Sequence, residues 1–207
     1  FFDREGNTLV LRPDFTPSVS RACATYFNLE KEVVSLCYTG NTFINNSSFR
    51  GRLKETTQMG VERMGDDSPE ADAEILAMTV ECLLATGLTE FQVSVGQVDY
   101  YKAIFAQTGL SQEEEEELRE LISQKNYFGV EELVKNKNMD KSLARVLSQL
   151  PQMFGSTEVL EKAKSLTDNP QALKAVARLE EIYELLKVYG YEKYVTFDFA
   201  MLSKYHY

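Results

Sequence analysis

The sequence predicts an α+β fold in which a mixed or antiparallel sheet is interrupted by an all-helical insertion. Strand and helix patterns alternate over residues 1–99, whereas residues 100–188 carry almost only helical patterns. A strand pattern then returns at residues 194–197. We therefore expect a core domain built from residues 1–99 and 189–207, with residues 100–188 as a helical insertion subdomain.

Both ends of the chain are abrupt. It starts at Phe1, without Met, inside an expected β-hairpin that turns at residues 5–7 before the apolar run at residues 9–11. It stops just as suddenly at Tyr207. We expect a core domain that is truncated at both ends.

The first half of the chain carries start and stop signals for two helices. Thr16 is a suitable cap and Pro17 is favoured in a first helical turn, so a helix should run from there to about Tyr26. Ser68 followed by Pro is a second such start, and Gly87 ends that apolar-periodic helix. The expected strands around them are Val33–Tyr38, Glu55–Met64 and Phe91–Val95.

The second half is marked by helix caps. Ser111 and Glu114 form the pattern of a capping box that opens a Glu-rich helix. Asn169 followed by Pro caps a longer apolar-periodic helix that should end near Gly190. A last strand is expected at Tyr194–Phe197.

Composition narrows the class of protein. The 207 residues are 43% hydrophobic, with 22 basic and 32 acidic side chains and a formal net charge of -10. This balance argues against nonspecific nucleic-acid binding and against docking on an anionic membrane. Three dispersed cysteines and one histidine show no metal-ligand spacing, so we expect reduced thiols, a cytoplasmic protein, and neither metal nor cofactor.

Candidate chemistry lies in three stretches, at residues 11–18, 51–62 and 197–207. Taken singly, each has an ordinary structural explanation as a turn, a helix cap or the exposed face of a strand. Together they supply carboxylates, hydroxyls and an amide, which suit an ammonium group because that group offers only donors. The sequence thus predicts a pocket for a free amino acid. Its expected lining is Asp14, Thr16, Gln58, Glu62 and Tyr207.

These stretches, in this order and around a helical insertion, resemble the class II catalytic core of histidyl-tRNA synthetases. The residues that carry the resemblance are Arg12–Thr16, the motif-two region from Tyr38–Gly40 to Gln58–Glu62, and Tyr205–Tyr207. The resemblance implies a class II synthetase-like fold. It also implies that the five candidate lining residues hold histidine.

Departures from that family bear on its chemistry. The resemblance leads us to expect an Arg after the motif-two Phe and an acid two residues later, but Ile44 and Asn46 stand there. Ser203 takes the place of a second Arg before the tyrosine motif. Cationic clamps on the charge that builds up during adenylation contribute roughly 3–4 kcal/mol each. Arg52 and Lys54 remain nearby, but by themselves they cannot replace both lost cations. We expect histidine binding without useful adenylation.

A histidine pocket without an activating site resembles the regulatory subunits of ATP phosphoribosyltransferase, the synthetase paralogues of histidine biosynthesis. The resemblance implies a subunit with no catalysis of its own that partners a short catalytic subunit in a hetero-octamer, associates with itself through its core and mediates feedback inhibition by L-histidine. Two other interpretations stay open. One is a divergent or partial histidyl-tRNA synthetase, and the other is a protein-interaction module in which the pocket is a relic.

Overall fold

The structure of the chain is a computed structural model. It describes residues 1–45, 51 and 53–202. Contacts between residues divide the chain into two compact units, one formed by residues 1–71 and the other by the described residues from 72 onward. The expected division into a core domain and an insertion at residues 100–188 stays a prediction.

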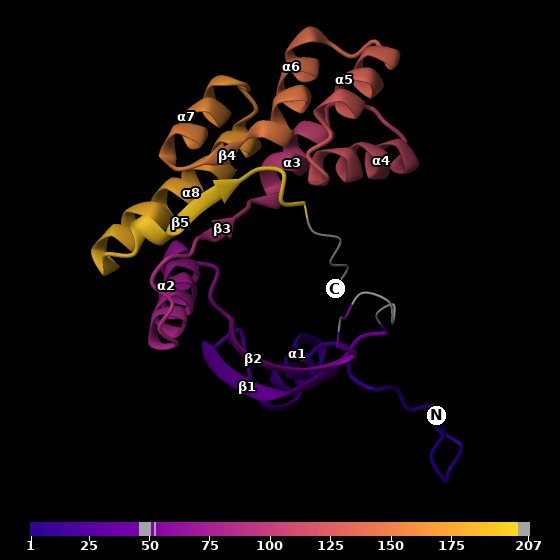
Figure 1. Ribbon diagram of the computed structural model, residues 1–207, viewed down its shortest axis with the longest axis vertical. Coiled ribbons are helices and arrows are strands. Elements are labelled where there is room, and N and C mark those ends of the chain that lie inside the picture. The colour runs from indigo at the N-terminus through magenta and orange to yellow at the C-terminus, as the bar shows by residue number, and fades with distance from the viewer. Residues whose placement is uncertain (46–50, 52, 203–207) are drawn as a thin grey trace. The chain divides into compact units, whose positions relative to one another are not determined.

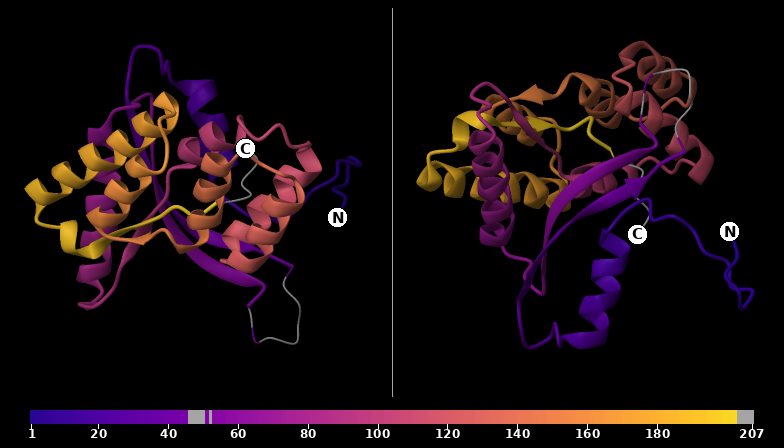
Figure 2. Two further views of the ribbon diagram at one scale, coloured as in Figure 1. Left: turned by 90° about the horizontal axis from the view of Figure 1, so that it is seen from above. Right: turned by 60° about the horizontal axis from the view of Figure 1, so that its bottom comes forward.

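The first unit is a helix and a long hairpin. Helix α1 (Thr16–Tyr26) precedes β1 (Val34–Phe43) and β2 (Glu55–Met64), which pair antiparallel from Val34 opposite Met64 to Phe43 opposite Glu55. Figure 2 shows α1 alongside this hairpin. The bounds of β2 and α1 match the prediction, whereas β1 runs five residues further than expected because its ladder with β2 continues to Phe43.

Few side chains are buried within the first unit. The buried ones among its described residues are Phe15, Cys23, Val34, Thr42 and Ala71. The hairpin ladder and cross-strand contacts such as the 3.2 Å pair of Thr42 and Thr56 hydroxyls therefore carry much of its order.

The expected strand at residues 9–11 is wrong. The turn before it forms, because the Asp3 carboxylate accepts hydrogen bonds from the backbone N–H groups of Glu5 and Asn7. An isolated bridge between Phe2 and Thr8 follows this turn, in place of the longer strand that was expected. Leu9 still pairs with Phe1, since its N–H donates to the Phe1 carbonyl at 2.8 Å and its carbonyl accepts from the N-terminal amino group at 3.0 Å. Residues 9–11 are nevertheless exposed and belong to no described strand.

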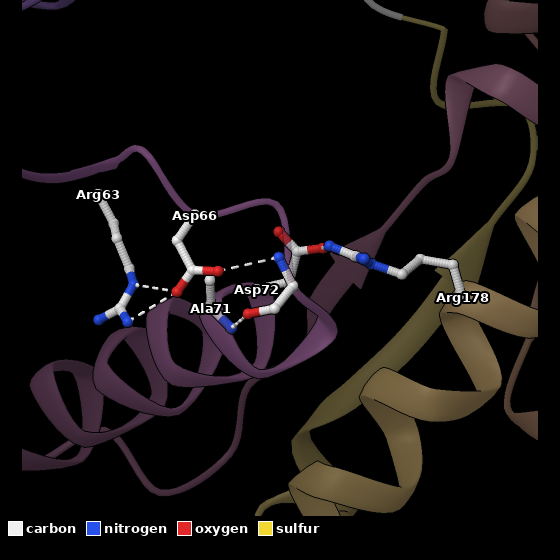
Figure 3. A network of polar contacts seen from close by, with 6 residues as sticks. Arg63, Asp66, Ala71, Asp72 and Arg178 are labelled. Carbon is white, nitrogen blue, oxygen red and sulfur yellow. Dashed lines mark hydrogen bonds and ion pairs between the residues drawn. The ribbon is translucent and has the colours of Figure 1, made fainter. Parts of the chain in front are cut away.

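The boundary helix α2 (Pro69–Ala85) is capped as predicted. Ser68 Oγ accepts a 3.2 Å hydrogen bond from the N–H of Ala71. Asp66 Oδ1 accepts from the N–H of Ser68, and its other oxygen accepts from Arg63 at 2.9 Å (Figure 3). The hydrogen bonds from Ser68, followed by those from Arg63, hold the pKa of Asp66 below its usual value.

The second unit is mostly helical around a small mixed sheet. Its three strands are ordered β3-β5-β4, with β3 parallel and β4 antiparallel to β5 (Figure 1). After α2 its elements are β3 (Val93–Val95), α3 (Val98–Phe105), α4 (Gln112–Ser123), α5 (Tyr127–Asn136), α6 (Lys141–Gln149), η2 (Leu150–Gln152), β4 (Phe154–Gly155), α7 (Thr157–Ser165), α8 (Pro170–Tyr189), η3 (Glu192–Tyr194) and β5 (Val195–Asp198).

The predicted caps of this unit are confirmed. Ser111 and Glu114 form a complete capping box at the start of α4, and Asn169 accepts from two N–H groups at the start of α8. Gly190 ends α8 in the left-handed conformation that glycine adopts most easily. The mixed sheet agrees with the predicted class, although the two-residue strand β4 lies inside a region expected to be helical throughout.

The core of the second unit is apolar and extensive. Tyr100, Leu118, Phe197 and Leu186 are fully buried within it. The Tyr100 phenol donates a 3.0 Å hydrogen bond to the carbonyl of Ala163, and burial raises the pKa of Tyr100 to about 12. Arg178 of α8 donates through Nε and Nη2 to Asp72 of α2, at 3.0 and 2.8 Å, which ties two helices of this unit together (Figure 3).

Candidate functional site

The candidate residues of the hairpin share one face of β2. The ladder places Gly40 opposite Gln58, Tyr38 opposite Gly60 and Leu36 opposite Glu62. Because side chains alternate along a strand, positions 58, 60 and 62 point to the same side of the ribbon. Glu62 is half-buried and Gln58 is exposed on this face.

The start of α1 brings a second pair of residues to Glu62. The Thr16 hydroxyl donates to Glu62 Oε1 at 2.6 Å, and the Thr16 backbone N–H donates to Asp14 Oδ1 at 3.2 Å. The 2.6 Å bond to the Glu62 carboxylate is charge-assisted, and short bonds of this kind are among the stronger hydrogen bonds in proteins. Asp14, Thr16 and Glu62 therefore form one cluster within the first unit.

The expectation that Thr16 caps α1 is wrong. The residue at the cap position is Phe15, whose side chain makes no capping hydrogen bond, and Thr16 is already helical. Thr16 has a single hydroxyl proton, and Glu62 accepts it. The side chain thus serves a contact between distant segments instead of the helix terminus.

Two aromatic rings cover the hairpin beside this cluster. Phe15 and Tyr38 are stacked, with ring centroids 4.6 Å apart and planes at 18°. The Arg12 guanidinium carbon lies 4.6 Å from the Phe15 centroid. Both rings need glycine beneath them, because a Cβ on Gly40 would lie 2.6 Å from Phe15 Cζ and a Cβ on Gly60 would collide with the Tyr38 phenol.

Tyr38 is the residue of this site that sequence reasoning missed. The sequence places Tyr38 in the motif-two region and indicates no role for it there. The signal that could have found it is the hairpin register, since Gly60 between Gln58 and Glu62 leaves space for the side chain that faces it. Burial, then the carboxylates of Glu62 and Asp14, raise the pKa of the Tyr38 phenol, and its hydrogen bond with Thr16 opposes that change. The phenol is neutral at physiological pH.

The two remaining predictions about the site differ in outcome. Gln58 lies on the same strand face as Glu62 but on the far side of Gly60, about 13 Å along an extended strand from Glu62. Tyr207 lies outside the described residues. The cluster that the structure assembles is thus Asp14, Thr16 and Glu62, with Tyr38 beside them.

This arrangement is chemically suited to a ligand that offers N–H donors. Two carboxylates and a hydroxyl oxygen lie close together, and the Arg12 guanidinium lies over the Phe15 ring. Among the residues that the structure describes, no group of three His, Cys, Asp or Glu could hold a metal ion. In that same part of the chain, no helix is both long and apolar enough to cross a membrane.

The position after the motif-two Phe lies at the end of the hairpin. The N–H of Phe43 donates to the Arg12 carbonyl, and the N–H of Ile44 donates to the Lys54 carbonyl, each at 2.9 Å. The Ile44 side chain is 52% exposed and brings no charge to this end of β1. Asn46, Arg52 and Ser203 lie outside the described residues.

The hairpin with its acceptor cluster, followed by helices and a mixed sheet, defines an α+β protein of the class II aminoacyl-tRNA synthetase type. More particularly, the chain belongs to the histidyl-tRNA synthetase family, whose model matches residues 1–207.

Similar proteins carry two kinds of name. The ATP phosphoribosyltransferase regulatory subunit of Acetivibrio thermocellus is 40% identical over 207 residues, which cover all of this chain and 50% of that protein. A crystal structure described as an ATP phosphoribosyltransferase regulatory subunit/histidyl-tRNA synthetase from Bacillus halodurans is 32% identical, with a TM-score of 0.85 over 98% of this chain and 52% of that one.

A third comparison shows the fold alone. The ATP phosphoribosyl transferase (HisG:HisZ) complex from Thermotoga maritima contains a chain that is 23% identical, with a TM-score of 0.71 over 97% of this chain and 69% of that one. The present chain spans about half the length of the curated relatives it matches.

Proposed function

We propose that the full-length protein is a non-catalytic regulatory subunit of ATP phosphoribosyltransferase, which activates the short catalytic subunit in the first step of histidine biosynthesis and mediates feedback inhibition by histidine. The observation that carries the proposal is an asymmetry at the hairpin. The acceptor cluster of Asp14, Thr16 and Glu62 is intact, while Ile44 stands where the resemblance to synthetases leads us to expect Arg. The name of the Acetivibrio relative supports the same assignment.

The acceptor cluster is the proposed histidine site. Asp14, Thr16, Gln58 and Tyr207 surround the α-amino group, which needs acceptors because it carries only donors. Glu62 orients the ligand through an imidazole N–H. A charge-assisted hydrogen bond to a half-buried carboxylate favours a ligand that presents this N–H over one that lacks it.

The same site would not support adenylation of the bound amino acid. Attack of a carboxylate on the α-phosphate of ATP builds negative charge, and each preorganised donor that stabilises it contributes roughly 3–4 kcal/mol. An exposed isoleucine at position 44 offers no such donor. Binding of the amino acid uses other residues, so it persists without activation, and no cofactor is required.

Regulation follows if histidine binds two arrangements of a complex with different affinity. The proposed partner is the short catalytic subunit, in a cytoplasmic hetero-octamer in which the synthetase-like cores also associate with one another. The Thermotoga structure, whose title names a HisG:HisZ complex, is a precedent for pairing with a second kind of subunit.

Two measurements on the full-length protein test this proposal. Adding it to purified short catalytic subunit should raise phosphoribosyltransferase activity, with co-elution of the two proteins, and L-histidine should reverse the activation. Calorimetric titration should show histidine binding that Glu62→Ala and Asp14→Ala weaken at least tenfold. Glu30→Ala, in an exposed loop of the same unit, is the matched control. Unchanged affinity in both site variants would contradict the pocket assignment.

The family assignment favours one alternative, an active histidyl-tRNA synthetase. Pyrophosphate exchange with histidine and ATP separates the two functions, because only a synthetase forms the adenylate. Robust exchange would overturn the regulatory proposal. If the protein shows no exchange, does not activate the catalytic subunit and does not co-elute with it, the results would instead favour an interaction module in which the pocket is a relic.

A further inference from the structure

A cavity of about 360 Å³ lies between four helices of the second unit. The C-terminal ends of α3 and α7 meet the N-terminal ends of α6 and α8 there. The Asn169 side chain links α8 to α3, because its amide donates to the Ala103 carbonyl at 3.1 Å. The volume lies within the range of small-molecule sites, near its lower end. We call this cavity the four-helix pocket.

The floor of the four-helix pocket is apolar. Ile104, Leu143, Val146 and Leu166 line it, and each is at most 9% exposed. All four belong to the core of the second unit, so the packing around them fixes the shape of the floor. A ligand that places a short hydrocarbon group against these side chains removes apolar surface from water. The floor therefore favours a small aliphatic body.

Two serines on the rim of the pocket present acceptors. The Ser142 hydroxyl donates to the Asp140 carboxylate, and the Ser165 hydroxyl donates to the Lys162 carbonyl at 2.8 Å. Each hydroxyl has only one proton to donate. Both serine oxygens therefore face a ligand as acceptors.

Gln107 and Asp168 add two more acceptors to the rim. The Gln107 amide nitrogen donates to the Ala103 carbonyl at 3.4 Å, which leaves the side-chain oxygen of Gln107 for a ligand. Asp168 is exposed, and within the described parts of the chain no cation pairs with its carboxylate. An ionised carboxylate is the strongest acceptor of this set, because hydrogen bonds to it are charge-assisted.

Caps take up N–H groups at both helix N-termini of the pocket. Asn169 Oδ1 accepts from two N–H groups at the start of α8, at 2.9 and 3.2 Å. Asp140 Oδ2 accepts from the N–H of Ser142 at the start of α6, at 2.8 Å. These are the groups that would otherwise attract an anion to a helix terminus. The available side chains thus favour a ligand that donates.

We propose that the four-helix pocket binds a small organic cation, with a primary ammonium group at Asp168 and a short aliphatic body on the apolar floor. An ammonium offers only donors, which the Asp168 carboxylate, the Gln107 side-chain oxygen and the two serine oxygens accept. A neutral alcohol lacks the charge that strengthens these bonds, and an anion is repelled by Asp168. The site belongs to the second unit and does not depend on the proposed function, whose acceptor cluster lies in the first unit.

Three ligands with one hydrocarbon body test the proposal. They are 3-methylbutan-1-amine, 3-methylbutan-1-ol and 3-methylbutanoate, which differ only in the head group. In calorimetric titrations of the full-length protein we expect the amine to bind at least about threefold more tightly than the alcohol, and the carboxylate to bind most weakly. Methyl NMR should locate the amine through shifts of the Leu143, Val146 and Leu166 resonances, because these side chains form the floor.

Asp168→Asn separates the charge from the shape of the pocket. Asp168 is exposed, so the variant should fold as the parent does, and we expect its affinity for the amine to fall to that for the alcohol. Glu181→Gln removes the same charge from an exposed position of α8, roughly 18 Å along the helix from Asn169, and is the matched control. The control should keep the preference of the parent for the amine.

Each contrary result overturns a defined part of the proposal. Equal affinity of the parent for amine and alcohol would refute recognition of a cation. An unchanged preference in Asp168→Asn would refute the role of that carboxylate. Shifts confined to methyl groups outside the floor, or no binding of any of the three ligands, would refute the site itself. None of these outcomes bears on histidine binding, so the proposed function is tested separately.

Discussion

Thr16 donates a 2.6 Å hydrogen bond to Glu62 across 46 residues of sequence, and this bond joins helix α1 to strand β2. Both side chains are half-buried, so water competes only partly for the contact. The bond fixes the geometry of the acceptor cluster and stabilises the first unit.

Thr16→Val should therefore lower both stability and ligand affinity. Valine keeps the shape but removes the donor, and a hydrogen bond to a charged acceptor contributes about 1.5 kcal/mol at the lower end of its range. Urea unfolding should report this loss, together with weaker histidine binding. Thr25→Val is the matched control, since its hydroxyl donates to the Arg21 carbonyl on an exposed part of α1. Equal losses in both variants would contradict a special role for Thr16.

Gly60→Ala should be disruptive because the added methyl group would collide with the Tyr38 phenol. Overpacking of this kind costs about 1–3 kcal/mol, which a shift of the urea midpoint would measure. The same substitution in a Tyr38→Ala background should be nearly neutral, because the ring is gone. A full cost in that background would show that some other contact at Gly60 is responsible.

Arg178→Gln tests the ion pair between α8 and α2. Asp72 has a side chain that is 52% exposed, so the expected loss is only about 0.5 kcal/mol, and added salt should reduce it. Lys174→Gln removes the same charge from an exposed position of α8 and serves as the control. A loss several times larger would mean that Arg178 contributes through packing as well as charge.

Glu114 should make stability depend on pH in acid. Its hydrogen bonds with Lys137, and then Ser111, lower its pKa from 4.5 to about 2. Between these values the unfolded chain binds the proton more readily, so stability is full above about pH 4.5 and falls as pH drops toward 2. Melting temperatures across this window should decline less steeply for Glu114→Gln than for the parent. Glu113→Gln, one residue earlier, is the control.

Local features of this chain could be predicted from sequence, and contacts between distant segments could not. The capping box at Ser111 and the cap at Asn169 were predictable because each satisfies backbone groups two or three residues away. Strand β4 was not, because two residues become a strand only by pairing with β5 more than 40 residues later. Residues 9–11 have the composition of a strand, but the described structure extends them into no ladder beyond the contact of Leu9 with Phe1.

In the candidate site, too, some features could be predicted from the sequence, whereas others depend on contacts between distant segments. Composition suggested that Asp14, Thr16 and Glu62 act together, and the structure joins them. The use of the Thr16 hydroxyl was mispredicted because a cap and a distant carboxylate compete for one proton. Tyr38 was missed because its importance depends on facing Gly60, which only the register of the hairpin reveals.

The few buried side chains of the first unit affect how a ligand would influence its motions. Units with little buried apolar surface open locally more often than well-packed ones, so amide protons of β1 and β2 should exchange with solvent sooner than those of α8. A ligand that binds only the closed form adds to its stability by mass action. Histidine should then slow amide hydrogen exchange selectively in the hairpin. The rate at which these strands open locally would therefore depend on whether the site is occupied.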